Sequence, residues 1–268
     1  MNKNPLLVLE AFGQSVWLDY LSRNAIDNGE LQGLINQDGV SGLTSNPSIF
    51  EKAIAESNDY DKAIQAMALQ GKSIEEIYQA LTVEDIQRAA DLFQPIYDRL
   101  EGRDGFVSLE VSPKLAHDTA GTIAEARRLW AVVDRPNLLV KVPATREGLP
   151  AIQQLIGEGI NVNITLLFGL PRYREVAEAY LTGLETLAAR GKPLNRITSV
   201  ASFFLSRIDV LIDPLLEKRS ATRNVAGMHG QVAIASAKVA YQIYQEIFGS
   251  ERFKKLSKLG ARTQRLLW

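Results

Sequence analysis

The sequence predicts an α/β fold built on parallel strands. Short apolar or β-branched runs alternate along the chain with longer segments of helical periodicity. Two of the runs, residues 138–142 and 164–168, are mostly apolar on both faces, as is typical of parallel strands covered by helices. A closed barrel and an open doubly wound sheet both fit this pattern. No linker rich in Pro, Gly or Ser divides the 268 residues, so we expect one domain over 1–268.

Seven strands are expected, in chain order. They lie at residues 15–19, 39–46, 105–111, 137–143, 161–167, 197–204 and 262–268. Between them, helix-start signals stand at Thr82 before a run to Leu100, at Asp118 before residues 119–134, and at Thr145 before residues 152–156. Residues 54–100 form a helical insertion between the second and third strands. We expect its 60–78 stretch to cover a barrel end or to extend into a partner.

The composition excludes several classes of function. Lys and Arg number 30 against 31 Asp and Glu, a net charge of -1, which argues against a nucleic-acid partner. The chain has no Cys and two His, so disulfides, thiolate metal sites, a Cys nucleophile and a three-His zinc site are excluded. No apolar run is long enough to span a bilayer. We therefore expect a cytoplasmic globular protein.

Polar residues recur where the apolar strands end, which is unusual for an α/β domain that has no functional site there. They are Asp19, Asn46, Glu110, Lys141, Asn163, Thr165 and Ser202, with Arg207 close behind. In a parallel barrel the carboxyl ends of all strands share one rim, so these side chains would converge on a single pocket. Alternate residues of a strand face the same way, so Asn163 and Thr165 are expected to point inward together, as are Ser202 and Phe204.

Lys141 is the sharpest of these signals. It lies between Leu-Leu-Val and Val-Pro inside a strand, where its ammonium group would reach water with difficulty. Desolvation lowers the pKa of a lysine and favours the neutral amine, which can attack a ketone and form a Schiff base. The alternative is a structural lysine that extends to the rim or forms an ion pair with Glu110 or Asp19.

Three further rim residues each have a structural alternative. Asp19 and Glu110 could transfer protons next to the lysine, but Asp19 could also cap the following helix and Glu110 could pair with Lys114. Asn46 lies within a Thr-Ser-Asn-Pro string. A role in the site and a structural role, as a strand terminator in an Asx turn, fit it equally well.

An ordered set of motifs resembles the transaldolase family, of the longer bacterial and plant-like type, over essentially the whole chain. The motifs are GLTSNPS at 42–48, VSLEV at 107–111, LVKVP at 139–143, GINVNITLLF at 159–168 and ASFFLSRID at 201–209. The resemblance implies a (β/α)8 TIM barrel of class I aldolase type. It also implies transfer of a dihydroxyacetone unit between sugar phosphates, with no cofactor, in the pentose phosphate pathway.

The same resemblance implies a role for each rim residue. Lys141 would carry the Schiff base, Asp19 would be the general acid and base, and Glu110 with Thr165 would position a water molecule. The remaining residues would bind substrate: Asn46, Asn163 and Ser202 the hydroxyl groups, Phe204 the pocket wall, and Arg207 the phosphate.

Two alternatives stay open at this point. The related fructose-6-phosphate aldolases carry a glutamine and a tyrosine where this chain has Glu110 and Phe204, so both residues favour the transferase. The sequence stops at Trp268 inside the expected seventh strand, and the family's eighth strand is missing from it. A fragment, a natural end and an inactive truncated barrel that serves as a binding partner are all compatible with this. A homo-oligomer is compatible with the sequence as well.

Overall fold

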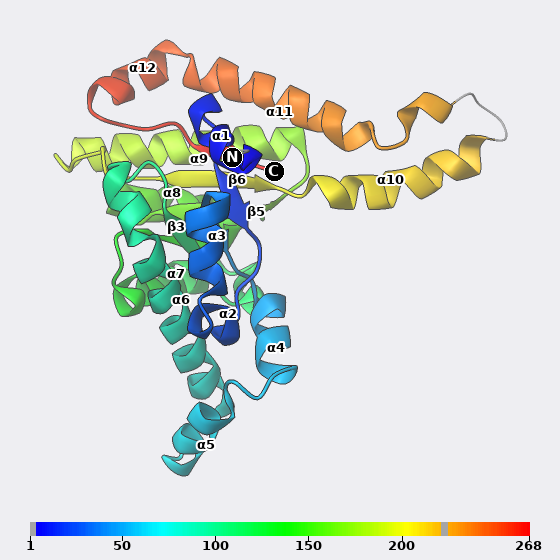
Figure 1. The fold of residues 1–268 in the computed structure, drawn as a ribbon. Helices are drawn as coiled ribbons and strands as arrows, with labels where there is room; N and C mark the ends of the chain where they lie inside the picture. The colour runs from blue at the N-terminus through cyan, green and yellow to red at the C-terminus, as the bar shows by residue number, and fades with distance from the viewer. Residues whose placement is uncertain (1–3, 221–224) are drawn as a thin grey trace. The chain divides into compact units, whose positions relative to one another are not determined.

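The computed structural model describes residues 4–220 and 225–268 and shows an α/β chain (Figure 1). All seven predicted strands are present, several of them shorter than expected. They are β1 (Val16–Leu18), β2 (Val40–Thr44), β3 (Phe106–Glu110), β4 (Leu138–Pro143), β5 (Val162–Leu167), β6 (Ser199–Phe203) and β7 (Arg265–Leu267). The described residues contain no eighth strand. None of the helices in this part of the chain is long and apolar enough to cross a membrane.

The chain divides into two compact units. The first comprises residues 1–113 and 124–140, and the second residues 114–123 and 141–268. Helices occupy most of the sequence between the strands in both. They are α1 (Pro5–Leu9), α2 (Arg23–Asp27), α3 (Glu30–Asp38), α4 (Pro47–Ala55), α5 (Asp61–Leu69), α6 (Ile74–Arg99), α7 (Thr119–Val133), α8 (Gly148–Glu158), α9 (Leu170–Ala189), α10 (Leu205–Ser220), α11 (Val232–Phe248) and α12 (Glu251–Lys258). The short 3-10 turns are η1 (Glu10–Phe12), η2 (Pro113–Leu115) and η3 (Ala226–Met228).

The first unit is built on β1, β2 and β3, which pair in parallel in that order. β1 is only three residues long and pairs Trp17 with Gly42 of β2. A β-carbon on Gly42 would lie 2.3 Å from the Trp17 indole, so glycine is what lets the ring lie flat against β2. Beyond β3, the backbone N–H of Val107 donates to the carbonyl of Asn137 at 2.9 Å, which brings the start of β4 alongside β3.

The predicted helical insertion is present, but one predicted helix start is wrong. The structure begins α6 at Ile74 rather than at Thr82, because Ser73 and Glu76 form a capping box there. Thr82 lies inside the helix, and its hydroxyl donates to the carbonyl of Gln79. α4, α5 and the first turns of α6 share a small apolar core of Tyr60, Ile77 and Leu81 (Figure 1). The insertion therefore has its own packing centre.

A buried polar network ties α2 to the insertion. The Nε of Arg23 donates to Asp85 at 2.9 Å, and its guanidinium carbon lies 4.7 Å from the centre of the Tyr60 ring. The Tyr60 hydroxyl donates to the second Asp85 oxygen at 2.8 Å and accepts from the Arg23 backbone N–H. Burial raises the pKa of the Tyr60 phenol, and the Asp85 charge raises it further. Each polar group in this network therefore has a partner, as burial requires.

The second unit is also built on parallel strands. The backbone N–H of Ala144 donates to the carbonyl of Thr165 at 2.8 Å, which sets the end of β4 beside β5. β5 then pairs with β6, and β6 with β7, both in parallel. The neighbouring helices α8 and α9 pack against each other, and α11 and α12 lie along α9 (Figure 1).

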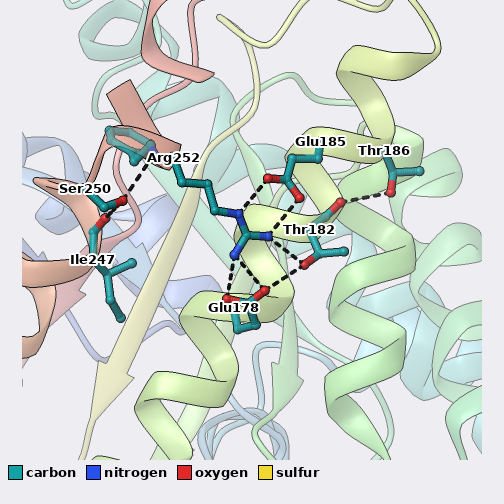
Figure 2. Close-up of polar contacts among 8 residues, drawn as sticks. Glu178, Thr182, Glu185, Thr186, Ile247, Ser250 and Arg252 are labelled. Atoms are coloured by element: carbon teal, nitrogen blue, oxygen red, sulfur yellow. Dashed lines mark hydrogen bonds and ion pairs between the residues drawn. The ribbon is translucent and has the colours of Figure 1, made fainter. Parts of the chain in front are cut away.

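One arginine fastens α12 to α9, as Figure 2 shows. The guanidinium of Arg252 contacts Glu185 at 2.6 and 2.8 Å, Glu178 at 2.7 Å and the hydroxyl of Thr182 at 3.2 Å. These bonds raise the pKa of Arg252 and lower that of Glu185. Because β7 follows α12, this contact also fixes where the chain returns to the sheet.

Candidate active site

Lys141 and Asn163 lie side by side on neighbouring strands of the second unit. The bond from Ala144 N–H to Thr165 C=O gives β4 and β5 a register in which Lys141 is level with Asn163. Side chains at one level of a parallel pair point to the same face of the sheet. Lys141 is 3% exposed and Asn163 is fully buried, so the burial of Lys141 predicted from its neighbours is confirmed.

Ser202 and Thr165 complete this group. The Ser202 hydroxyl donates to the side-chain oxygen of Asn163 at 2.7 Å, so each fixes the orientation of the other. Thr165 is 1% exposed, and its hydroxyl has no hydrogen-bond partner among the residues that the structure describes. A buried hydroxyl without a protein partner is where a water molecule or a ligand would be expected to bind.

β5 is irregular at this point. Ile164 pairs with Ala201 and Leu167 with Phe203, so β5 has one residue more than β6 over that stretch. The extra position is Leu166, whose φ of +60° is in the left-handed region and whose side chain is 42% exposed between two buried residues. This bulge was not among the features expected from the sequence. Its one sequence signal is the break in alternation at Leu166-Leu167-Phe168.

Phe204 and Arg207 stand directly after β6. The Phe204 ring lies 5.7 Å from that of Phe168, and the Arg207 guanidinium carbon lies 5.1 Å from the Phe204 ring centre. Arg207 is in the first turn of α10 and exposed, which leaves a cation accessible near the end of β6.

Asn46 and Glu110 lie at one level in the first unit. Thr44 pairs with Ser108, which places Asn46 and Glu110 two residues further on at the ends of neighbouring strands. The Asn46 side-chain oxygen accepts from the N–H of Ile49 and caps α4, so its structural interpretation is confirmed. The capping alternative for Asp19 is wrong. Asp19 is exposed directly after β1, and Ser22 caps α2 instead.

Tyr78 of α6 is a rim residue that sequence reasoning missed. Its ring meets Phe50 of α4 edge-on, with centres 6.5 Å apart. Burial raises the pKa of the Tyr78 phenol, and the charges of Glu110 and then Glu51 raise it further, so the phenol lies near the end of β3. Only the three-dimensional packing of the insertion could have shown this.

Parallel strands, a lysine buried in one of them, and amide and hydroxyl groups beside it are typical of aldolase-type enzymes that bind carbonyl substrates. Within the described residues, no three His, Asp or Glu side chains gather so that they could hold a metal ion.

Comparisons with known proteins establish the family. The model of the Transaldolase/Fructose-6-phosphate aldolase family matches residues 16–264, and the chain belongs to this family. A transaldolase of Trichodesmium erythraeum is 49% identical over 275 residues, covering 100% of this chain and 72% of that protein. Transaldolases of Saccharopolyspora erythraea (51% over 263 residues, 98% and 70%) and Thermobifida fusca (50% over 265 residues, 99% and 72%) are similarly close.

Proposed function

We propose that the chain is a transaldolase that moves a dihydroxyacetone unit between sugar phosphates. The donor would be sedoheptulose 7-phosphate or fructose 6-phosphate, and the acceptor glyceraldehyde 3-phosphate or erythrose 4-phosphate. The observation that carries the proposal is 49 to 51% identity with transaldolases over at least 98% of this chain.

Lys141 is the proposed nucleophile. Its amine adds to the ketone carbon of the donor, and loss of water gives an iminium ion that withdraws electrons from the carbon–carbon bond between the α and β carbons. Breaking that bond releases an aldehyde and leaves the dihydroxyacetone unit on the lysine as an enamine. The enamine then attacks the acceptor aldehyde, and water releases the product. The burial of Lys141 supports this role, since burial favours the uncharged amine.

Proton transfer is the proposed work of Asp19, Glu110 and Thr165. Asp19 removes the hydroxyl proton as the carbon–carbon bond breaks and returns it when the new bond forms. Glu110 and Thr165 hold the water that is lost and regained around the iminium ion. The buried hydroxyl of Thr165, which lacks a protein partner, supports this assignment.

Substrate binding is assigned to the remaining rim residues. Asn46, Asn163 and Ser202 would hold the hydroxyl groups, and the Asn163–Ser202 bond supports a preset geometry. Arg207 would hold the phosphate through two N–H groups, with Phe204 orienting its planar guanidinium.

The proposal extends to the setting of the enzyme. It is cytoplasmic, acts in the pentose phosphate pathway without a cofactor, and its partners are sugar phosphates.

Reductive trapping tests the proposed function directly. Borohydride added with fructose 6-phosphate reduces an imine to a stable secondary amine, so mass spectrometry of peptides should find the adduct on Lys141. Lys141→Met should give no adduct and no transfer. Transfer activity with an unmodified Lys141, or an active Lys141→Met variant, would overturn the proposal.

The second candidate is a fructose-6-phosphate aldolase, because the matching family includes both activities by name. That enzyme would release free dihydroxyacetone when no acceptor aldehyde is present. Glu110 and Phe204 favour the transferase. Dihydroxyacetone accumulating at the rate of donor consumption would decide for the aldolase.

A further inference from the structure

The bulge in β5 separates two residues that a regular strand would put on the same face. Thr165 and Leu167 are two apart, so in an unbroken strand they would point the same way. The extra residue at Leu166 lets Leu167 pair with Phe203, whose ring packs on Tyr173 of α9 with centres 5.2 Å apart. Thr165 stays on the face of β5 that carries Asn163. The bulge thus serves both the core and the site.

The backbone of Leu166, rather than its side chain, makes this arrangement. The side chain is 42% exposed and carries no polar group. Its φ of +60° is one that L-residues other than Gly, Asn and Asp rarely adopt, and β-branched residues least of all. The flanking hydrogen bonds, Ala144 N–H to Thr165 C=O at 2.8 Å and Phe204 N–H to Leu167 C=O at 3.1 Å, hold both sides of the bulge in place.

We propose that Leu166 is a positioning residue of the reaction: its left-handed backbone lets Leu167 face the core while the Thr165 hydroxyl stays on the face of the sheet shared by Lys141 and Asn163. The inference rests on the proposed function, since it concerns the water that Thr165 would hold. Bulges and strained backbone near active sites commonly re-aim a side chain in this way.

Two substitutions separate backbone from side chain. Leu166→Val keeps an apolar side chain but disfavours the left-handed conformation, whereas Leu166→Asn loses the apolar group and accepts that conformation. We expect Leu166→Val to lower kcat by about ten- to a hundredfold with little change in KM, as a small misplacement of a reacting group does. Leu166→Asn should stay within about threefold of the wild type, a difference that corresponds to less than 1 kcal/mol. The reverse ranking would overturn the inference, because the side chain would then be what matters.

A coupling measurement asks whether Leu166 acts through Thr165. In a Thr165→Ala background, Leu166→Val should cost no more than about twofold in kcat, because the group it misplaces is already gone. A full additive loss would contradict the proposal. Should Leu166→Val fail to fold, Leu166→Ala against Leu166→Gly poses the same question, since glycine alone of the two accepts a positive φ freely.

A spectroscopic readout needs no turnover. The methyl NMR signal of Thr165, assigned by its loss in Thr165→Ala, should move in Leu166→Val and stay in place in Leu166→Asn. An unmoved signal in both variants would overturn the inference. Failure of the proposed function would show differently, as the absence of a borohydride adduct on Lys141 of the wild-type protein.

Discussion

Arg23 shows how strongly burial changes the contribution of an ion pair to stability. One nitrogen of its guanidinium lies 2.8 Å from Glu84 and 2.8 Å from Asp85, two consecutive residues of α6. The Glu84 side chain is 52% exposed and the Asp85 side chain is fully buried. Water screens the first pair, whereas the second was desolvated on folding and depends on its partner.

Asp85→Asn should therefore destabilise the protein far more than Glu84→Gln. The first change leaves the buried guanidinium with only the solvent-exposed carboxylate of Glu84 and should lower the free energy of unfolding by about 3 kcal/mol. The second removes an exposed contact of the same length and should cost less than about 1 kcal/mol. Urea unfolding of both variants measures the difference. Equal losses would show that burial does not set the strength of these contacts.

The roles and surroundings of single residues could be predicted from the sequence to different degrees. The burial of Lys141 could be predicted because its apolar neighbours in the sequence already indicate a buried strand. Asn46 had two interpretations, and the structural one, a polar residue that ends the strand and bonds to the backbone just after it, holds in the structure without excluding the other. Leu166 was not readable, because a positive φ in leucine comes from the strands on either side rather than from local preference.

At the scale of elements, the pairing of β1 with β2 depends on a glycine, Gly42, which has no side chain. Its three residues pair with β2 across Gly42, where a β-carbon would meet three indole atoms of Trp17 at 2.3 to 2.6 Å. The Trp17 N–H donates to the hydroxyl of Ser15, which restricts movement of the ring.

Gly42→Ala should thus lower the free energy of unfolding by about 1–3 kcal/mol through overpacking. Gly33→Ala is the matched control, because Gly33 is in α3, where an added β-carbon meets nothing within 4 Å. That change should raise the free energy of unfolding by about 0.5–1 kcal/mol. Thermal unfolding of the two variants should shift in opposite directions. A neutral Gly42→Ala would mean that the indole has another position.

Element boundaries were harder to predict than the elements themselves. Thr82-Val-Glu-Asp85 has the form of a helix start, as does Ser73-Ile-Glu-Glu76, and local chemistry does not rank them. The insertion's apolar core decides, because Ile77 must already be helical to pack against Tyr60. Tertiary packing of this kind is what a local pattern does not contain.

For the whole molecule, acid should weaken the fold partly through the carboxylates that arginines hold. Arg252 lowers the pKa of Glu185, and Arg99 lowers that of Glu10, each below its ordinary value of 4.5. A lowered folded-state pKa gives stability that is present above the unfolded-state value and is lost as the pH falls through the folded-state value.

Arg252→Met should therefore cost about 1 kcal/mol of unfolding free energy at pH 7, a modest figure because the pairs are partly exposed. The difference from the wild type should shrink as the pH falls through the lowered folded-state pKa of Glu185, because the protonated carboxyl group no longer gains from the arginine. Urea unfolding at several pH values tests this. A difference that is constant with pH would assign the effect to packing of the arginine's aliphatic stem.

The fold class of the whole chain was predictable because it depends on a repeated pattern. Each of the seven strands was found from alternation and apolar content, and parallel pairing followed from the helices between them. The alternation of strands and helices did not distinguish a closed barrel from an open sheet, since the same elements build both. Only the resemblance of the motifs to a known family favoured the barrel.

The irregular strand β5 also bears on protein engineering. Anyone who transplants this pocket into a different scaffold has to move Val162–Leu167 as one six-residue cassette. A host strand that is one residue shorter would turn either the threonine or the following leucine to the wrong side. In an alignment, a single-residue gap at this place would mark a changed chemistry rather than a harmless length difference.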